Sequence, residues 1–282
     1  MNRARRRLFT QLAVLGVILA LGASVPSISA QDPSASLDCD QVVARMVARN
    51  QERAHALEGY RARRHYHLDY TGVLGGRQAD MVVEVVYRSP GEKRFNVVSE
   101  GGSKWICNHV LRRLMQVEQE NAGVGARERT EINPQNYTFR LLSVQPGEGG
   151  TPYYVMEAAP KTDSTYLFRG KVWVEGRDFA VARIEGEPAK NPSRWTKQSD
   201  FRHDYLSQEG FWLPARNDTT TQLHLLGQSH LVIEYSDYQV TRAGGESPAP
   251  ARVGAAVSSP QIPVNAHWGT AAGQPAGKEA SH

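Results

Sequence analysis

The sequence lacks the short motifs that mark nucleotide, metal and nucleophile chemistry. It has no phosphate-binding Walker loop, no dinucleotide fingerprint, no H-E-x-x-H pair, no paired C-x-x-C and no G-x-S-x-G turn. It also has no internal repeat. We therefore expect no cofactor, no metal and no enzymatic activity, and any function must come from what the fold encloses.

Long apolar runs are also scarce. The main one, residues 8–21, follows four arginines within the first seven residues. Ile28-Ser29-Ala30 then offers a cleavage site, so residues 1–30 are predicted to be a signal peptide cleaved after Ala30, and the protein to be periplasmic. Ser27-Ile28-Ser29, the stricter small-x-small match, places the cut one residue earlier. A transmembrane anchor is disfavoured because the run is short for a hydrocarbon core of about 30 Å. Sec and twin-arginine export both stay open.

An excess of positive charge is missing once the leader is removed. The leader holds four of the 33 basic residues and no acidic residue, which leaves 29 basic against 29 acidic residues in the mature chain. The overall charge therefore gives no reason to expect nucleic acid or an anionic membrane surface as a partner.

Cysteine occurs only at Cys39 and Cys107. In an exported chain, two cysteines suit one disulfide, here between the starts of two predicted helices, worth about 2–5 kcal/mol. Two separate thiols are the alternative. Cys39 follows Ser36-Leu37-Asp38 and not the small residue that a lipidated cysteine requires, which favours a soluble exported protein over a lipoprotein.

The C-terminal residues 243–282 lack hydrophobic periodicity and are rich in Gly, Ala, Pro and Ser. Such a segment buries too little apolar surface to offset its ordering entropy, so we expect a disordered tail. Residues 31–242 remain for one domain.

Alternating hydrophobicity dominates that domain. In residues 166–187, two runs of period two flank the turn residues Gly176-Arg177-Asp178, a pattern that predicts a β-hairpin. In residues 79–88 both faces are apolar, which indicates a strand covered on both sides. Further strands are expected at residues 60–71, 93–99, 137–144, 153–158, 203–206, 211–215, 219–226 and 229–240. About ten strands of this kind predict one curved antiparallel sheet.

Two segments have helical periodicity instead. Residues 40–57 carry an apolar stripe that includes Val43, Met46, Val47 and Leu57, and Asp38 or Asp40 can cap the start. Residues 105–121 carry a second stripe, with Arg112, Arg113, Glu118 and Glu120 assigned to the polar side. Each stripe is typical of a helix that packs on a sheet.

A few polar residues are candidates for a catalytic, metal-binding or ligand-binding role. His65 and His67 have a spacing that could bind a metal, but no third ligand follows, so a solvated strand face is favoured. His203, beside Arg202 and Asp204, is the only catalytic candidate, and a surface strand start is the favoured interpretation. Arg88 is interpreted as a strand end, with the mouth of a cavity as the alternative.

Several of these segments resemble the periplasmic outer-membrane lipoprotein carrier superfamily (LolA/LolB-like, lipoprotein-sorting proteins). The matching features are the helix ending in Gly59-Tyr60, the step Arg88-Ser89-Pro90, the hairpin Lys171 to Glu175 into Val181 to Glu185, and Gly210 to Pro214. The resemblance implies an α+β, mostly antiparallel fold: an unclosed half β-barrel whose concave apolar face is covered by two main helices and holds acyl chains. In characterised carriers the key arginine directly precedes the proline, whereas Ser89 stands there and Arg88 lies one residue earlier.

The expected function is a soluble, monomeric carrier or chaperone of lipid acyl chains or lipidated proteins, working with envelope transport proteins. The alternative is a non-catalytic envelope sensor or protein-interaction module on the same fold. An ordinary packed core is the alternative to a cavity. The predicted cavity lining is Val43, Met46, Val47, Met81, Val83, Val85, Tyr87, Ile106, Val110, Leu114 and Met115, with Arg88 at the mouth.

Overall fold

The computed structural model describes residues 37–73 and 75–244. These lie within one compact unit, Leu37–His282. The predicted leader and nearly all of the predicted tail fall outside the described residues. Within the described ranges, no helix combines the length and apolarity needed to cross a membrane.

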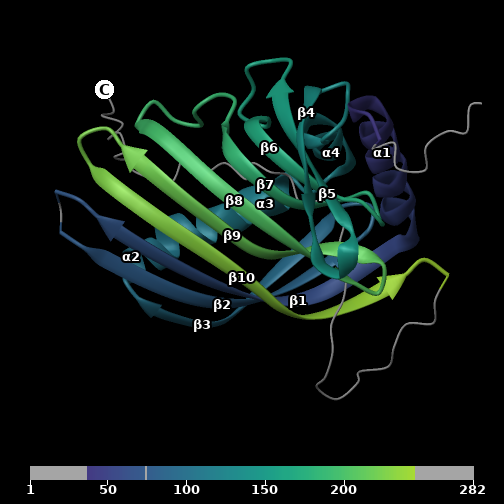
Figure 1. The fold of residues 1–282 in the computed structure, drawn as a ribbon. Coiled ribbons are helices and arrows are strands. Elements are labelled where there is room, and N and C mark those ends of the chain that lie inside the picture. The colour runs from purple at the N-terminus through teal and green to yellow at the C-terminus, as the bar shows by residue number, and fades with distance from the viewer. Residues whose placement is uncertain (1–36, 74, 245–282) are drawn as a thin grey trace, which may run out of the picture. The chain divides into compact units, whose positions relative to one another are not determined.

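A single ten-stranded antiparallel sheet organises the domain, in the order β3-β2-β1-β10-β9-β8-β7-β6-β5-β4 (Figure 1). The sheet is not closed, because β3 and β4 are its two edges. The predicted fold class, a mostly antiparallel half-barrel with helices, is confirmed. The strands are β1 (Leu57–Thr71), β2 (Arg77–Arg88), β3 (Glu92–Gly102), β4 (Tyr137–Pro146), β5 (Pro152–Pro160), β6 (Phe168–Glu175), β7 (Ala180–Pro188), β8 (Thr196–Gln208), β9 (Phe211–Leu223) and β10 (Gly227–Arg242).

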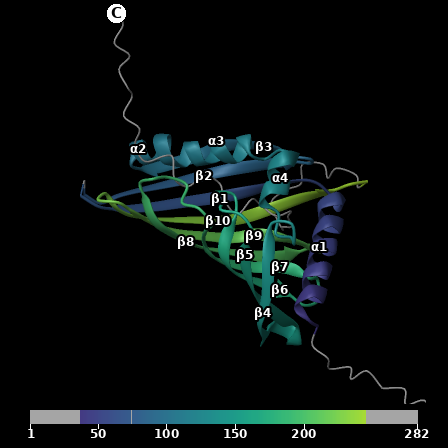
Figure 2. The ribbon, with the colours of Figure 1, turned by 90° about the horizontal axis from the view of Figure 1, so that it is seen from above.

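Helices pack on the two ends of the sheet (Figure 2). Helix α1 (Cys39–Ala56) packs on β4, β7 and β1. A continuous helical segment packs on β2 and β3; it consists of α2 (Lys104–Ile106), a π-helical turn η1 (Cys107–Leu111) and α3 (Arg112–Glu120). Two short elements were not predicted, α4 (Val124–Thr130) and a 3₁₀ turn η2 (Glu148–Gly150).

The start of α1 follows from its sequence. The Asp38 carboxylate accepts a hydrogen bond from the Gln41 backbone N–H at 2.8 Å, and the Gln41 side chain accepts one from the Asp38 N–H at 3.2 Å. This reciprocal capping box satisfies two donors that an uncapped helix leaves unpaired. Val42, Val43 and Met46 form the buried face, and β1 begins at Leu57 directly after the helix.

The central hairpin is present as predicted, with β6 ending at Glu175. The Glu175 carboxylate closes the turn by accepting from the backbone N–H groups of Arg177 and Asp178, at 3.1 and 2.7 Å. Phe179 completes the turn at φ +49°. A bulge between Trp173 and Val174 shifts the register within the hairpin.

Three sequence predictions of local structure were wrong. The runs at 211–215 and 219–226 form one strand, β9, because the polar residues between them stay paired with β8 and β10. Strand β8 begins at Thr196, earlier than the predicted residue 203. In β2 only alternate residues are fully buried, with Val82 and Val86 half-buried, so one face of this strand remains partly open to solvent.

Candidate functional site

The buried face of the sheet carries two separate apolar clusters. Cluster A joins β1, β2, β9 and β10 to the helical segment α2–α3. Cluster B joins α1 to β4–β8. The predicted cavity residues are divided between them. Cluster A holds Met81, Val83, Val85, Tyr87, Ile106, Leu114 and Met115, with half-buried Val110 against it, whereas cluster B holds Val43 and Met46, with half-buried Val47 against it. The two helical stripes therefore do not meet in one lining.

Between the clusters lies a row of buried polar side chains on the two central strands. This β8–β9 polar row consists of Ser199, His203, Asn217, Thr219 and Thr221, all buried. Strand pairing places Ser199 opposite Thr221 and His203 opposite Asn217. Since residues two apart on a strand share a face, the five side chains lie on the inner side of the sheet together with Phe201 of cluster B, which is opposite Thr219.

Part of this row is satisfied internally. The hydroxyls of Ser199 and Thr221 are 3.0 Å apart and hydrogen-bonded. The Asn217 amide donates to the hydroxyl of Tyr235 at 2.9 Å. These pairs hold the side chains in fixed orientations, so the row is preorganised.

Other atoms of the row have no partner. Within the described residues, His203 Nε2 and Thr219 Oγ1 are buried without a hydrogen bond, as is Thr196 Oγ1 at the start of β8. Most buried polar atoms in folded proteins are paired, and leaving one unpaired costs about 1–3 kcal/mol. These three atoms, on the neighbouring strands β8 and β9, are polar groups of this surface that no described residue pairs.

The row is uncharged at neutral pH. Burial lowers the pKa of His203 to about 4, and the nearby Asp204 carboxylate opposes this shift only in part. Hydroxyls, an amide and a neutral imidazole bind neutral carbonyl and hydroxyl groups, whereas a buried anion needs a cation. The expected ligand chemistry is therefore polar but not ionic.

Neither helix packs chiefly on the two strands of the row, although all five of its side chains are buried. Helix α1 packs mainly on β4 and β7, and α2–α3 packs on β2 and β3 (Figure 2). The row on β8 and β9 lies between these two regions of the sheet. A molecule that contacts the row therefore also approaches both apolar clusters.

A buried ion-pair network lies in cluster A. Arg64 donates through both terminal nitrogens to Glu118, at 2.7 and 2.9 Å, and Lys93 donates to the same carboxylate at 2.6 Å. Although burial opposes ionisation, the two cations hold the pKa of Glu118 well below its ordinary value. Both cations are thus committed to Glu118 and do not serve as a free anion site.

Sequence reasoning missed this network. Glu118 was assigned to the polar face of the second helix, which is wrong because the carboxylate is buried against Arg64. The sequence analysis gives Arg64 no role, although it alternates between Ala62 and Tyr66, both buried. That period of two was the signal that could have identified it.

The other candidate residues have simpler surroundings. His65 and His67 contact Asp80 at 3.2 and 2.7 Å, and the hydrogen bond to Asp80 raises the pKa of His67. The described residues contain no group of three or more side chains arranged to hold a metal. Arg88 is exposed at the end of β2, where its backbone pairs with Glu92. His203 is buried inside β8 and does not lie at a surface strand start, so that interpretation was wrong.

The predicted disulfide between Cys39 and Cys107 is not formed, and both residues are free thiols. Cys39 packs against cluster B, while Cys107 belongs to cluster A. The first helix starts beside β4 and the second helical segment starts beside β2, which lie at opposite ends of the strand order. The alternative of two separate thiols holds in this structure.

No known family profile matches the chain, and no curated protein matches its sequence. Solved structures do match. An outer membrane lipoprotein-sorting protein domain from Vibrio parahaemolyticus is 10% identical, with a TM-score of 0.33, covering 69% of this chain and 90% of its own. A LolA superfamily protein from Nitrosomonas europaea is 14% identical, with a TM-score of 0.33, covering 73% and 94%. A DUF1329 family protein from Desulfovibrio piger is 14% identical, with a TM-score of 0.35, covering 72% and 94%.

Two of these three names are those of the superfamily that the sequence motifs resemble. At such TM-scores the strand order and helix placement of this chain, and not the likeness, define its fold.

Proposed function

We propose that the protein is a periplasmic carrier that binds lipid acyl chains, free or attached to a protein, on the inner face of its half-barrel. The observation that carries the proposal is the β8–β9 polar row: buried, uncharged, partly unpaired and placed between two apolar clusters. A purely apolar core has no use for such a row. In a site for a molecule whose long apolar chains join at a neutral polar group, the row can bind that polar group.

Acyl esters and amides have that composition. Burial contributes about 0.8 kcal/mol per CH₂, so a chain of about 16 carbons gains about 12 kcal/mol before entropy costs. The ester or amide carbonyl accepts a hydrogen bond, which the Thr219 hydroxyl can donate. A free carboxylate fits less well than an ester, because the nearby buried cations Arg64 and Lys93 are paired with Glu118.

Part of the sequence-based site stays within this proposal as a prediction. The side chains of clusters A and B that flank the row are the proposed walls for the acyl chains. Arg88 is the proposed residue at the mouth of the site, where it would contact the polar end of the acyl chain. His203 has no catalytic part in the proposal; it contributes a neutral hydrogen-bonding group.

Competition binding tests the proposal on protein spanning residues 31–282, which contains all of the described residues. A fluorescent fatty acid is displaced by methyl palmitate, palmitate or hexadecane. We expect methyl palmitate to compete best. The change Thr219→Val removes one hydrogen bond to the ester. It should weaken the binding of methyl palmitate about 2- to 10-fold and leave the binding of hexadecane unchanged. Thr220→Val, the neighbouring residue on the opposite face of β9, is the matched control.

Two results would count against acyl binding. One is the absence of any co-purifying lipid together with no uptake of the fluorescent fatty acid. The other is capture of one stable protein partner with only weak, modulatory lipid binding, which would favour the sensor or interaction module.

A further inference from the structure

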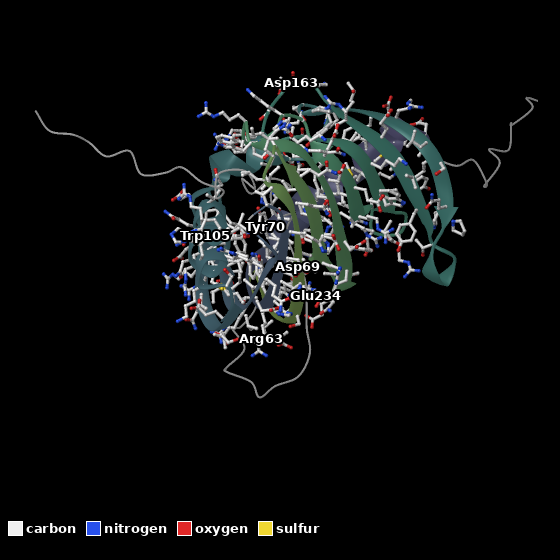
Figure 3. The ribbon with its side chains drawn as sticks, turned by 90° about the vertical axis from the view of Figure 1, so that its left-hand side faces the viewer. Arg63, Asp69, Tyr70, Trp105, Asp163 and Glu234 are labelled. Carbon is white, nitrogen blue, oxygen red and sulfur yellow. The ribbon has the colours of Figure 1, made fainter. Side chains whose placement is uncertain are left out.

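Four exposed, large apolar side chains lie where the strands turn, at the side of the sheet that carries the β1–β2 and β9–β10 turns. Val73 is at the β1–β2 turn, Leu225 at the β9–β10 turn, Trp195 just before β8 and Trp105 at the start of α2, with exposed fractions of 73, 93, 44 and 46%. We refer to these four residues as the apolar rim. Figure 3 looks toward this end of the sheet and labels Trp105 and Tyr70.

Hydrogen bonds join the segments that carry the rim. The Tyr70 hydroxyl donates to the carbonyl of Leu226, which ties the β1–β2 turn to the β9–β10 turn. The His224 N–H donates to the Trp195 carbonyl at 2.9 Å, which ties the latter turn to the segment before β8. The Ser103 N–H donates to the Gln78 carbonyl at 2.8 Å and holds the start of α2 beside β2. The rim is therefore one supported surface and not four independent loop tips.

The charge around the rim has one sign. The segments 71–77, 102–105, 189–197 and 222–228 contain five basic residues and no acidic residue. The five are exposed, and none forms an ion pair with a described residue: Arg77, Lys104, Lys190, Arg194 and Lys197. The overall neutrality of the mature chain concealed this local concentration.

Two acidic residues on the adjoining strands are engaged elsewhere, whereas Asp163 in the β5–β6 loop and Asp200 on β8 are exposed. Asp80 is engaged by His65 and His67, and Glu100 pairs with Arg112 at 2.7 Å. Arg194 lies over the Trp195 ring, 5.8 Å from its centroid. A cation beside an exposed indole is a combination suited to the boundary between lipid headgroups and acyl chains.

We propose that the apolar rim and its five basic residues dock the protein on the surface of an anionic phospholipid bilayer. Exposed apolar patches of this kind mark interaction sites, and each basic residue near an anionic surface strengthens binding about fivefold. The tryptophans and Leu225 would enter the interfacial layer while the basic side chains contact phosphates. This inference goes beyond carriage of acyl chains, because docking needs no occupied inner face.

Vesicle sedimentation tests the docking with protein spanning residues 31–282. We expect co-sedimentation with phosphatidylglycerol-containing vesicles, weak sedimentation with pure phosphatidylcholine, and release by salt. The double change Lys104→Gln/Arg194→Gln should weaken binding at least about tenfold. Val73→Ser/Leu225→Ser should weaken it similarly, and brominated lipid should quench Trp105 and Trp195, an effect lost in Trp105→Phe/Trp195→Phe.

Matched controls separate docking from general effects. Arg61→Gln/Lys171→Gln removes two exposed basic residues outside the rim segments, and Val98→Ser/Leu142→Ser removes two exposed apolar residues on the edge strands. Both should bind vesicles like the parent. Equal sedimentation of rim and control variants, or binding to a protein partner with no vesicle binding, would overturn the proposal. In the rim variants, methyl palmitate should still displace the fluorescent fatty acid. Failure of docking and failure of acyl carriage are therefore distinguishable.

Discussion

Arg64 and Glu118 are 54 residues apart in sequence and form a two-point ion pair inside the protein, with nitrogen–oxygen distances of 2.7 and 2.9 Å. The Arg64 guanidinium also lies between the rings of Phe95 and Tyr235, 5.3 and 4.9 Å from their centroids. The pair joins β1 to α3, and the hydrogen bond from Lys93 to Glu118 also joins β3 to α3. Because a buried ion pair often stabilises no more than apolar residues would, its main effect is to fix where α3 sits on the sheet.

Removing the charge of Glu118 should destabilise the fold strongly. Glu118→Gln leaves Arg64 and Lys93 buried without a counter-charge, a change that costs about 3–5 kcal/mol. In a domain of this size the melting temperature should fall by about 10 °C. Thermal unfolding followed by circular dichroism measures this. The control Glu120→Gln, on the exposed face of the same helix, should stay within about 0.5 kcal/mol.

The same pair predicts a pH dependence. The folded-state pKa of Glu118 lies below its ordinary value of 4.5, so its stabilisation is complete above that pH and is lost as the pH falls further. The difference in unfolding free energy between the parent and Glu118→Gln should therefore be constant from about pH 6 to pH 8 and narrow below about pH 4.5. A constant difference down to pH 3 would contradict the assignment.

His203 predicts that the free energy of unfolding depends on pH in a higher pH range than the one set by Glu118. Its folded pKa of about 4 lies below the ordinary 6.5, so between these values the unfolded chain binds more protons than the folded chain. Stability contributed by neutral His203 is complete above pH 6.5 and should fall by about 3 kcal/mol on acidification to pH 4. Urea unfolding at pH 7 and pH 4.5 should show a smaller loss for His203→Gln than for the parent. His224→Gln, at an exposed histidine, should behave like the parent.

The cysteines should titrate as thiols without reductant. Burial raises the pKa of both Cys39 and Cys107, so neither is readily converted to the reactive thiolate. In the native protein we expect slow reaction with a thiol reagent, and in denaturant two thiols per molecule. If the unreduced protein were about 2 Da lighter than the reduced protein and had no reactive thiol, the disulfide prediction would be restored.

Alternation made most of the sheet predictable. Each strand with one buried face repeats its pattern over many residues, as in β1, so the approximate number of strands and their antiparallel arrangement could be inferred. The missing information was long-range. Glu118 reads as polar helix surface until Arg64 and Lys93 are seen to face it, and the β8–β9 polar row reads as a weak strand or a loop. Its hydroxyl and amide side chains break the apolar alternation, which divided β9 into two predicted strands.

The cavity prediction also failed to specify which residues meet. Apolar stripes in the two helices indicate that each packs on a sheet, but not that they pack on different ends of one sheet. Val47 and Val110 therefore lie against different clusters. Only the strand order, with β9 paired to β8 at the centre, separates the two ends.

Tryptophan substitutions probe whether cluster A is packed. Val85 and Leu114 are almost fully buried within it. Enlarging either to Trp should lower the unfolding free energy by about 1–3 kcal/mol through overpacking, with fluorescent fatty acid uptake retained by the folded protein. Val98→Trp, on the exposed side of β3, should have little effect on either measurement. Loss of uptake at unchanged melting temperature would instead place the acyl chains between Val85 and Leu114.

Thr219 offers a test of whether its unpaired hydroxyl is kept for binding. The side chain is buried, and its oxygen has no hydrogen-bond partner among the described residues. Replacing Thr by Val keeps the shape and removes a polar atom whose burial costs about 1–3 kcal/mol. Thr219→Val should therefore leave stability unchanged or raise the melting temperature by up to about 6 °C.

Thr220→Val, on the other face of β9, removes a hydroxyl that is half-buried, and should change the melting temperature by less. A more stable Thr219→Val protein that binds methyl palmitate less well would show that this position trades stability for ligand binding, as functional sites commonly do. A clear loss of stability in Thr219→Val would mean that the hydroxyl has a structural partner. The polar row would then be part of the folded core, and its Thr219 member would have no remaining capacity for an acyl ester.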